Sequence, residues 1–577
     1  MYRLLLALLL VGLVACAPAP TPAAVPQPTS PPAATAVPVG NQAPAATEPP
    51  AATKAPAATT APMSTQAPAA TTAKSPETGG TITVGYDIEP ESLDIHVGER
   101  GQLPAIMRNV YDTLLVKALD GSFKPSLATS WDVSPDGKTY TFKLRQGVMF
   151  QDGTPFNAQA VKFNFDRIVD PALESRWAKQ LIGPYDSSEA VDDYTVRIKL
   201  KDSYGPFLEA LTQTFLGMVS PTAVQKWGKD YASHQVGTGP FIFKEYVPKD
   251  HLTLERNPDY NWAPAIYQHQ GPAYVDRIIF KFIPESATRL GTVETGETNL
   301  IHTFAPTDLP VIRSDSNLQV YINSRAGRAR HYTLNVQKEP TNDLAVRQAL
   351  NMAIDRPTIA KTLFGDVNSP AFGHFAPGTL YYSDSLEKEY SQKYAYDPAK
   401  AAKLLDDAGW TMGTDGIRHK GGKPLSLVLV SSSQKEVHEL IQAQLKKIGV
   451  DVQIQMMAVP AFFAACGKGD DNLCFLGGIG TPDPGLWMSG YFGLDGKYNW
   501  SNHKNTQLDS LLSDGLKTAD PAKRQDIYSQ VQRIILDQAL TLPVFYERDT
   551  YVARSEVKNL TFDAFSDPVL YDAYIQK

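Results

Sequence analysis

The sequence is poor in the side chains that bind metals. It has three cysteines, and its ten histidines are scattered without the spacing of a metal site, so we expect neither a metal nor another cofactor. Cys16 lies near the N-terminus, which leaves Cys466 and Cys474 with seven residues between them. In an oxidising compartment this pair forms either a disulfide or two buried free thiols, and the sequence leaves both alternatives open.

Catalytic motifs are also missing. There is no Gly-x-Ser-x-Gly elbow and no Gly-x-x-x-x-Gly-Lys phosphate loop. His438 begins a pattern like that of a zinc-protease helix, but Gln442 stands where the second histidine is needed, so we expect His438 on a helix surface. Neighbouring carboxylates usually point apart, so we expect solvated turns or helix surfaces at Asp192-Asp193, Asp406-Asp407 and Asp470-Asp471. A secreted hydrolase is the disfavoured alternative.

Neither charge nor hydrophobicity suits a nucleic-acid partner or a membrane-spanning domain. The formal net charge is −7 at pH 7, which argues against nucleic acid. Beyond the N-terminal segment, no apolar run approaches the roughly 20 residues needed to span a bilayer. We therefore expect the chain after Cys16 to be soluble.

The first 16 residues predict export and lipid attachment. Arg3 gives a positive start, and the apolar run over 4–14 is too short to span a bilayer. The run ends in Leu13-Val14-Ala15-Cys16, the pattern of a lipobox. We expect a signal peptide over 1–16 and a diacylglycerol on the Cys16 thiol, which would anchor the chain to the outer face of the cell membrane. Export without a lipid is the alternative.

Residues 17–78 consist largely of alanine, proline and threonine. The segment has no aromatic residue and little charge, so it cannot bury enough apolar surface to offset the entropy of ordering. Frequent proline favours extended polyproline II, at about 3.1 Å per residue. We expect a disordered tether that holds the folded part away from the membrane.

The folded part shows both strand and helix patterns. Alternating apolar residues predict strands at 82–86, 140–144 and 194–200, and Asn157 is a candidate helix cap. Later helices begin at Asp397-Pro398 and Asp520-Pro521, each with a cap and a first-turn proline. Between them a strand, a helix and a strand, over 425–430, 437–448 and 450–456, predict a right-handed βαβ unit, the building block of an open parallel sheet.

Six ordered blocks of sequence carry a resemblance to a known family. They lie at 87–94, 109–115, 125–156, 237–241, 256–260 and 346–356, and the most specific runs from Pro125-Ser126-Leu127-Ala128-Thr129-Ser130-Trp131 to Asp152-Gly153-Thr154-Pro155-Phe156. Together they resemble the extracellular solute-binding proteins of the peptide/nickel class (family 5) of ABC importers. The resemblance covers essentially the whole folded part.

The resemblance implies an α/β, two-lobed fold like that of periplasmic binding proteins, with an extra subdomain in the first lobe and a hinge between the lobes. We place lobe I at 79–111, 236–325 and 545–577, the extra subdomain at 112–235, and lobe II at 326–544. The lobes would close over a ligand without covalent chemistry, and ABC permease subunits would recognise the closed form. A ligand sensor that hands its closed form to a signalling protein would have the same sequence features.

The sequence departs from the peptide-binding members in one loop. In those members a Gly-Trp-x-x-Asp loop offers its aspartate to the terminal ammonium of the peptide, whereas here Gly477 replaces the tryptophan and Gly480 the aspartate. A buried ammonium needs a paired anion, and Asp483 is a nearby substitute. We expect an oligopeptide ligand, with an oligosaccharide stacked on aromatic faces as the alternative.

The position of residues in the family pattern predicts which side chains line the cleft between the lobes. They are Asp87, Glu89 and Tyr111 from lobe I, and Gly480, Asp483 and Trp487 from lobe II. The sequence therefore predicts a lipid-anchored extracellular component of an ABC importer, which captures a small molecule and is not an enzyme.

Overall fold

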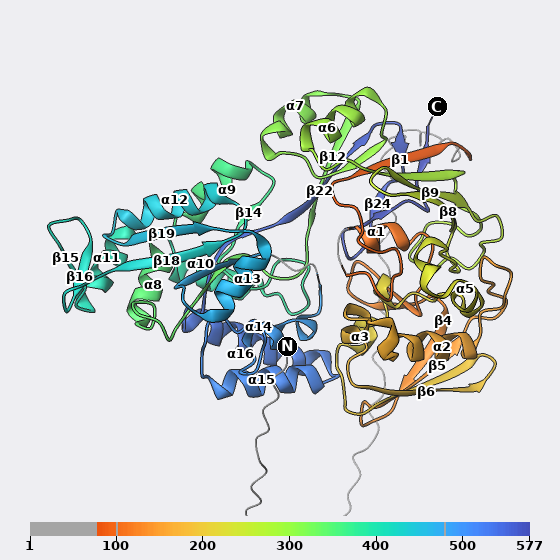
Figure 1. Cartoon of the computed structure of the whole chain (residues 1–577), viewed down its shortest axis with the longest axis horizontal. Coiled ribbons are helices and arrows are strands. Elements are labelled where there is room, and N and C mark those ends of the chain that lie inside the picture. Colours follow the sequence, from red (N-terminus) through yellow and green to blue (C-terminus); the bar gives the residue numbers. More distant parts are fainter. Residues whose placement is uncertain (1–77, 100–101, 478–480, 577) are drawn as a thin grey trace, which may run out of the picture. The chain divides into compact units, whose positions relative to one another are not determined.

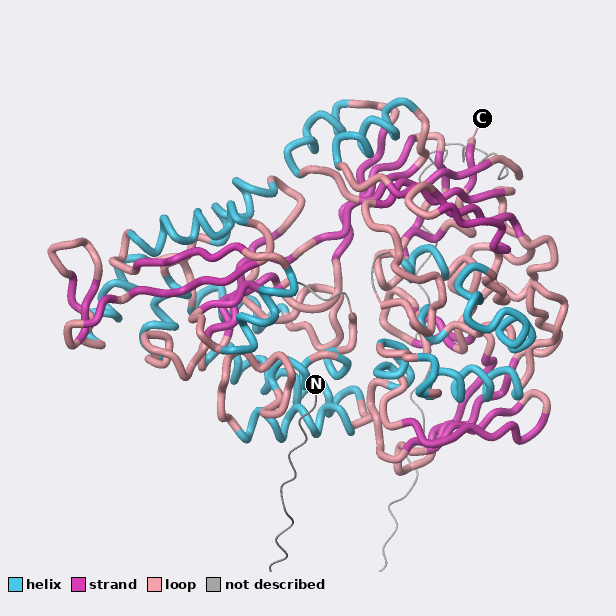
Figure 2. Tube along the Cα trace, in the orientation of Figure 1, coloured by secondary structure: helices cyan, strands magenta, loops and turns pink. Residues whose placement is uncertain are grey.

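The computed structural model describes residues 78–99, 102–477 and 481–576 (Figure 1; Figure 2). The predicted signal peptide, Cys16 and nearly all of the tether lie outside these residues, as does Gly480. Among the described residues, no helix is both long enough and apolar enough to cross a membrane. The same residues form three sheets of four or more strands.

The largest sheet lies in lobe I. In spatial order its strands are β12 (Leu318–Ser324), β22 (Arg548–Arg554), β11 (Leu300–His302), β1 (Thr81–Tyr86), β10 (Arg277–Phe282), β9 (His251–Arg256) and β8 (Phe241–Val247). β1 runs parallel to β10 and β11, and the other neighbouring strands are antiparallel. Lobe I also contains α1 (Leu103–Met107), α6 (Ser286–Thr295), α7 (Leu309–Ser314) and the short C-terminal strands β23 (Val557–Lys558), β24 (Thr561–Phe562), β25 (Pro568–Val569) and β26 (Tyr574–Ile575).

Residues 112–235, which we predict to form the extra subdomain, contain an antiparallel sheet of four strands. Their order is β4 (Ala128–Val133), β5 (Thr139–Leu144), β7 (Thr195–Leu200) and β6 (Tyr185–Asp192). The amphipathic helix α2 (Ala158–Val169) packs on β6 and β7 and buries its apolar face there. The remaining elements are the β2 (Leu115–Lys117) and β3 (Phe123–Pro125) hairpin and the helices α3 (Trp177–Leu181), α4 (Phe207–Ala210) and α5 (Pro221–Trp227).

Lobe II is built on a six-stranded sheet. Its order is β14 (Ser369–Pro370), β21 (Thr541–Tyr546), β13 (Arg330–Leu334), β20 (Leu473–Leu476), β18 (Ser426–Ser431) and β19 (Asp451–Met456). A small three-stranded sheet contains β15 (Thr411–Met412), β16 (Arg418–Lys420) and β17 (Lys423–Pro424). The helices are α8 (Leu344–Met352), α9 (Arg356–Phe364), α10 (Asp384–Lys393), α11 (Pro398–Asp407), α12 (Lys435–Lys446), α13 (Val459–Lys468), α14 (Met488–Phe492), α15 (Thr506–Lys517) and α16 (Pro521–Asp537).

The predicted βαβ unit is present in lobe II, but the sheet around it is mixed. β18 and β19 are parallel and α12 connects them, and β20 also runs parallel to β18. β13, however, pairs antiparallel with both β20 and β21. The prediction of an open parallel sheet is therefore wrong for half of the sheet, because the chain enters and leaves lobe II along antiparallel strands.

The predicted helix caps are confirmed. The Asn157 side chain accepts a hydrogen bond from Ala160 N at 3.0 Å, and Asp397 accepts one from Lys400 N at 2.8 Å. Asp520 caps α16 in the same way. Each cap satisfies an amide at a helix start that has no partner within the helix, which is typically worth about 1 kcal/mol.

The glycines at 237 and 239 allow two chain segments to approach closely. A Cβ at Gly237 would lie 2.1 Å from Val110 O, and one at Gly239 would lie 2.7 Å from Val110 C. Neither glycine has a positive φ. Glycine is therefore needed at these positions for space between lobe I segments and not for unusual backbone angles.

His438 is buried, and its predicted position on a helix surface is wrong. Its Nδ1 lies 2.6 Å from the Tyr332 hydroxyl and its Nε2 lies 2.9 Å from Ser433 O. Nε2 therefore donates to the carbonyl and Nδ1 accepts from the hydroxyl. Burial lowers the pKa of His438 to about 4, so the ring is neutral at pH 7 and serves the packing of α12 against β13.

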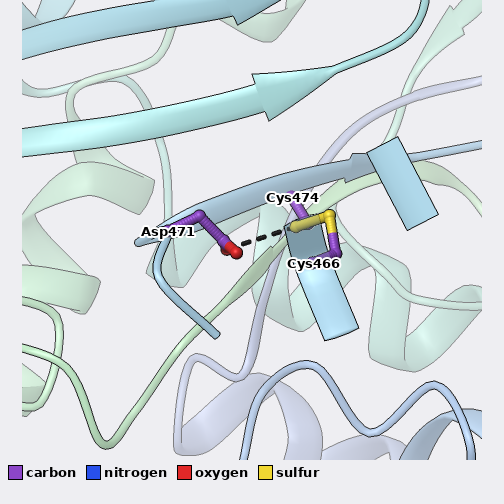
Figure 3. Close-up of side chains that lie close together, drawn as sticks. All are labelled: Cys466, Asp471 and Cys474. Atoms are coloured by element: carbon purple, nitrogen blue, oxygen red, sulfur yellow. Dashed lines mark hydrogen bonds between the residues drawn. A yellow bond between two sulfur atoms is a disulfide. The ribbon is translucent and has the colours of Figure 1, made fainter. Parts of the chain in front are cut away.

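Cys466 and Cys474 form a disulfide that joins the end of α13 to β20 (Figure 3). Asp471 is also buried beside it, contrary to the expectation of a solvated position, and its Oδ1 lies 3.2 Å from Cys474 Sγ. A bonded sulfur carries no proton, so Cys474 Sγ cannot donate in this contact, and the carboxyl group can donate only in its protonated form. Burial raises the pKa of Asp471 to about 6, so the carboxyl group is protonated below about pH 6 and mostly ionised at pH 7.

Asp471 should make the stability of the protein depend on pH. Its folded pKa of about 6 lies above the usual value of 3.8, so its stabilising effect is complete below pH 4 and is lost as the pH rises through 6. We expect this loss to be on the order of 1–3 kcal/mol, and we expect it to be missing in Asp471→Asn. Urea unfolding of both proteins from pH 4.5 to 7.5 measures it. A stability difference between the two that does not change with pH would contradict the assignment.

Candidate functional site

Two chain segments cross between the lobes. One joins the end of β12 to β13 over 325–330, and the other joins β21 to β22 around Glu547 (Figure 1). Glu547 accepts a hydrogen bond from Arg330 Nη2 at 2.7 Å and lies 3.5 Å from Arg325 Nη1. This carboxylate therefore links the two crossing segments, and motion of one lobe against the other has to turn about them.

A separate seam joins the extra subdomain to lobe II. Gly205 N donates to Leu516 O at 2.8 Å, and Gln180 Nε2 donates to Leu486 O at 2.9 Å. A Cβ at Gly205 would lie 2.1 Å from Thr518 O, so the seam requires glycine there. The chain thus has contacts between these parts at a surface other than the crossing segments.

Asp483, a predicted ligand residue, forms a buried ion pair inside lobe II. Arg524 Nη1 and Nη2 donate to its two carboxylate oxygens, each at 2.7 Å. Both side chains are almost fully buried, and Asp483 also accepts a hydrogen bond from Gly485 N. Burial lowers the pKa of Arg524, but the charge of Asp483 outweighs this effect and raises it overall. In this structure the Asp483 charge is engaged by Arg524.

Trp487 lies in a buried group of aromatic and basic side chains. Its Nε1 donates to Thr481 O at 3.3 Å, and the guanidinium carbon of Arg328 lies 5.9 Å from the centre of its ring. The same carbon lies 3.8 Å from the ring centre of Tyr491, and Arg328 Nε donates to Gly477 O at 2.9 Å. Arg328 therefore connects the crossing segment to the end of β20.

Asp87 and Glu89, which are predicted to line the cleft from lobe I, contact different partners. Asp87 lies 2.9 Å from His302, and this contact outweighs burial and holds the pKa of Asp87 below its usual value. Glu89 accepts hydrogen bonds from Lys249 N and from the Tyr246 hydroxyl. The structure does not bring these two carboxylates together.

The hydroxyl of Tyr111 bonds to Tyr231 and Gln235, at 2.8 and 2.5 Å. Tyr111 also lines a cavity of about 30 Å³ in lobe I and the extra subdomain, which is large enough for one or two water molecules. The cavity wall includes Lys117, which forms a buried ion pair with Glu209 at 2.9 Å. Burial raises the pKa of Glu209. Sequence reasoning missed this pair, because its members come from separate elements.

Among the described residues, a cluster of three side chains with metal-ligand atoms contains Cys466, Asp471 and Cys474 (Figure 3). Both sulfur atoms are bonded to each other, so neither is a thiolate that could bind a metal. The cluster is better described as a disulfide with a buried carboxyl group beside it.

A family model decides what this two-lobed arrangement is. The model described as "Bacterial extracellular solute-binding proteins, family 5 Middle" matches residues 122–500. The chain belongs to this family. The glutathione-binding protein GsiB of Shigella flexneri is 31% identical over an alignment of 471 residues, which covers 79% of this chain and 86% of that protein.

Solved structures agree with the family 5 assignment. NikA from Brucella suis in complex with Fe(III)-EDTA has a TM-score of 0.77 at 28% identity, covering 86% of this chain and 100% of NikA. DppA from Helicobacter pylori in complex with the peptide STSA has a TM-score of 0.69 at 27% identity, covering 87% and 99%. The predicted two-lobed fold and family are confirmed. This family 5 protein is an extracytoplasmic solute-binding component of ABC importers, and it is not an enzyme.

Breaking the Asp483–Arg524 pair should strongly destabilise lobe II. Asp483→Ala leaves the guanidinium buried without its anion, and we expect a loss of about 3–5 kcal/mol in the free energy of unfolding. Asp407→Ala, which breaks the exposed pair with Lys403, is the control and should change stability little. Urea unfolding measures both. Equal small losses would show that the buried pair contributes no more than the exposed one.

Proposed function

We propose that this family 5 protein captures a short peptide outside the cell for import. The observation that supports this ligand is the 31% identity to the glutathione-binding protein of Shigella flexneri over most of both chains. The DppA structure with the peptide STSA supports the same ligand class. Glutathione is a small peptide with two carboxylates and one amine, so it is a suitable first probe.

The alternatives are an oligosaccharide ligand and a role as a ligand sensor. The aromatic side chains near Trp487 would suit a sugar, since Tyr491 and Tyr498 stack 5.0 Å apart in the same lobe. A sensor would bind the same ligands and would not support uptake. Uptake of a labelled ligand by cells with and without the protein separates import from sensing.

The cleft residues predicted from the family pattern remain part of this proposal. Asp87 and Trp487 are the two whose surroundings suit ligand binding, because both lie beside segments that lead into the crossing between the lobes. Opening at the crossing segments would expose them, and closure at the Gly205 seam would bury the ligand. Burial of the ligand then supplies affinity through desolvation and a few placed polar groups.

Ligand binding should raise the thermal midpoint of the full mature chain. A ligand that binds only the native state stabilises it, by about 2.7 kcal/mol at a concentration 100 times its dissociation constant. We expect glutathione or other short peptides to shift the midpoint and neutral oligosaccharides to leave it unchanged. A shift with oligosaccharides alone would mean that the ligand is a sugar and not a peptide. No shift with either class would argue against both proposed ligands.

We propose that Cys16 carries the lipid anchor, because it ends the lipobox Leu13-Val14-Ala15-Cys16. Metabolic labelling with a fatty acid should therefore label the wild-type chain and leave Cys16→Ser unlabelled. Cys466→Ser with Cys474→Ser serves as the matched control, and this variant should keep the label. Label in the Cys16→Ser protein would place the lipid elsewhere.

A further inference from the structure

Arg328 differs from the other deeply buried arginines of lobe II in having an unsatisfied donor. Its Nη1 is buried and has no hydrogen-bond partner among the described residues. Arg356, by contrast, donates from Nε, Nη1 and Nη2 to backbone and side-chain oxygens, and Arg524 is paired with Asp483. Leaving a buried charged donor unpaired costs several kcal/mol, and among the described residues Arg328 Nη1 lacks an acceptor.

The neighbouring carboxylates do not supply that acceptor. Glu547 is bound to Arg330 and lies near Arg325, and Asp549 lies 3.8 Å from Arg325. In the described part of the chain, no carboxylate lies within ion-pair distance of Arg328. The segment over 325–330 thus carries three cationic side chains, and of these Arg328 alone has no anion within ion-pair distance among the residues that the structure describes.

Gly477, the first residue after β20, also lies beside positive charge. Arg328 Nε donates to Gly477 O, and a Cβ at Gly477 would lie 2.3 Å from Arg330 Nη1. A tryptophan at 477, as in the peptide-binding pattern, would therefore require the end of the Arg330 side chain to move. Where that pattern presents an acid to a ligand ammonium, this chain places two arginines at the start of the loop.

Arg328 also lies close to the surface where the lobes meet. Its guanidinium faces the rings of Tyr491 and Trp487, and Leu486, next to Trp487, accepts the hydrogen bond from Gln180 of the extra subdomain. Aromatic faces on a guanidinium hold its plane and keep water away, which strengthens its bonds to an anion.

We infer that Arg328 binds a carboxylate of the ligand, so that the ligand class is an acidic peptide whose free amine is dispensable. The inference rests on the proposed function and narrows it. A guanidinium can donate two parallel hydrogen bonds to a carboxylate, and Nη1 is free to provide one of them. The ligand carboxylate then supplies the anion that the protein itself does not give to Arg328.

Matched ligands test the inference on the full mature chain by calorimetric titration. The probes are glutathione, glutathione amidated at its carboxylates, N-acetylated glutathione, other short peptides with free or amidated C-termini, and a neutral oligosaccharide. We expect amidation to weaken binding by about 10- to 100-fold and acetylation of the amine to change it little, because a hydrogen bond to a charged group contributes about 1.5–3 kcal/mol.

Protein variants complete the test. Arg328→Gln should weaken binding of the peptide acids by the same factor as amidation, and the amidated ligands should lose nothing further on this variant. Arg328→Lys should retain part of the affinity, and the exposed Arg313→Gln is the matched control that should bind like the wild type. If Arg328→Gln fails to fold, comparison of each peptide acid with its amide on the wild-type protein still tests whether binding depends on the ligand carboxylate.

The outcomes separate this inference from the proposed function. Three results would overturn the carboxylate assignment. They are equal binding of the acids and the amides, losses of affinity from amidation and from Arg328→Gln that add up, and binding of the oligosaccharide alone. Capture of a solute for import would still stand in those cases. If no probe of either class binds, both the peptide proposal and the carboxylate assignment fail.

Discussion

The bridge that Glu547 makes between Arg325 and Arg330 is the contact on which the two-lobed arrangement depends. It joins the two segments by which the chain passes between the sheets of lobe I and lobe II. Because one carboxylate serves arginines at both ends of 325–330, it fixes this segment as a short, charged strap. Arg328 lies in the middle of this strap. The carboxylate nearest to the strap, Glu547, is already occupied by Arg325 and Arg330.

Local sequence signals predicted local structure well. The caps at Asn157 and Asp397 and the parallel unit over 426–456 depend on residues close together in sequence, so their patterns are visible without a fold. His438 was misplaced because its partner Tyr332 is 106 residues away. Helix periodicity cannot show that a polar side chain has found such a distant partner, and so it favours the surface.

The candidate site was harder to predict for the same reason. Family position located Asp483 and Glu89, but it said nothing of Arg524, 41 residues beyond Asp483, or of Tyr246, whose hydroxyl donates a hydrogen bond to Glu89. Gly480 lies outside the described residues. The sequence did show three arginines within six residues, in the run Arg325-Ala326-Gly327-Arg328-Ala329-Arg330. This density of positive charge was the only sequence feature that pointed to the segment.

The place of β22 in the lobe I sheet sets an order for building the protein. β22 lies between β12 and β11, and all of lobe II lies in the chain between β12 and β22. A ribosome therefore finishes every strand of lobe II before it makes the strand that gives β12 its neighbour. Lobe II therefore has all of its strands before β12 has its neighbour, in whichever compartment the chain folds. Lobe I keeps an unpaired strand exposed until the last tenth of the chain becomes available, and it is open to aggregation during that interval.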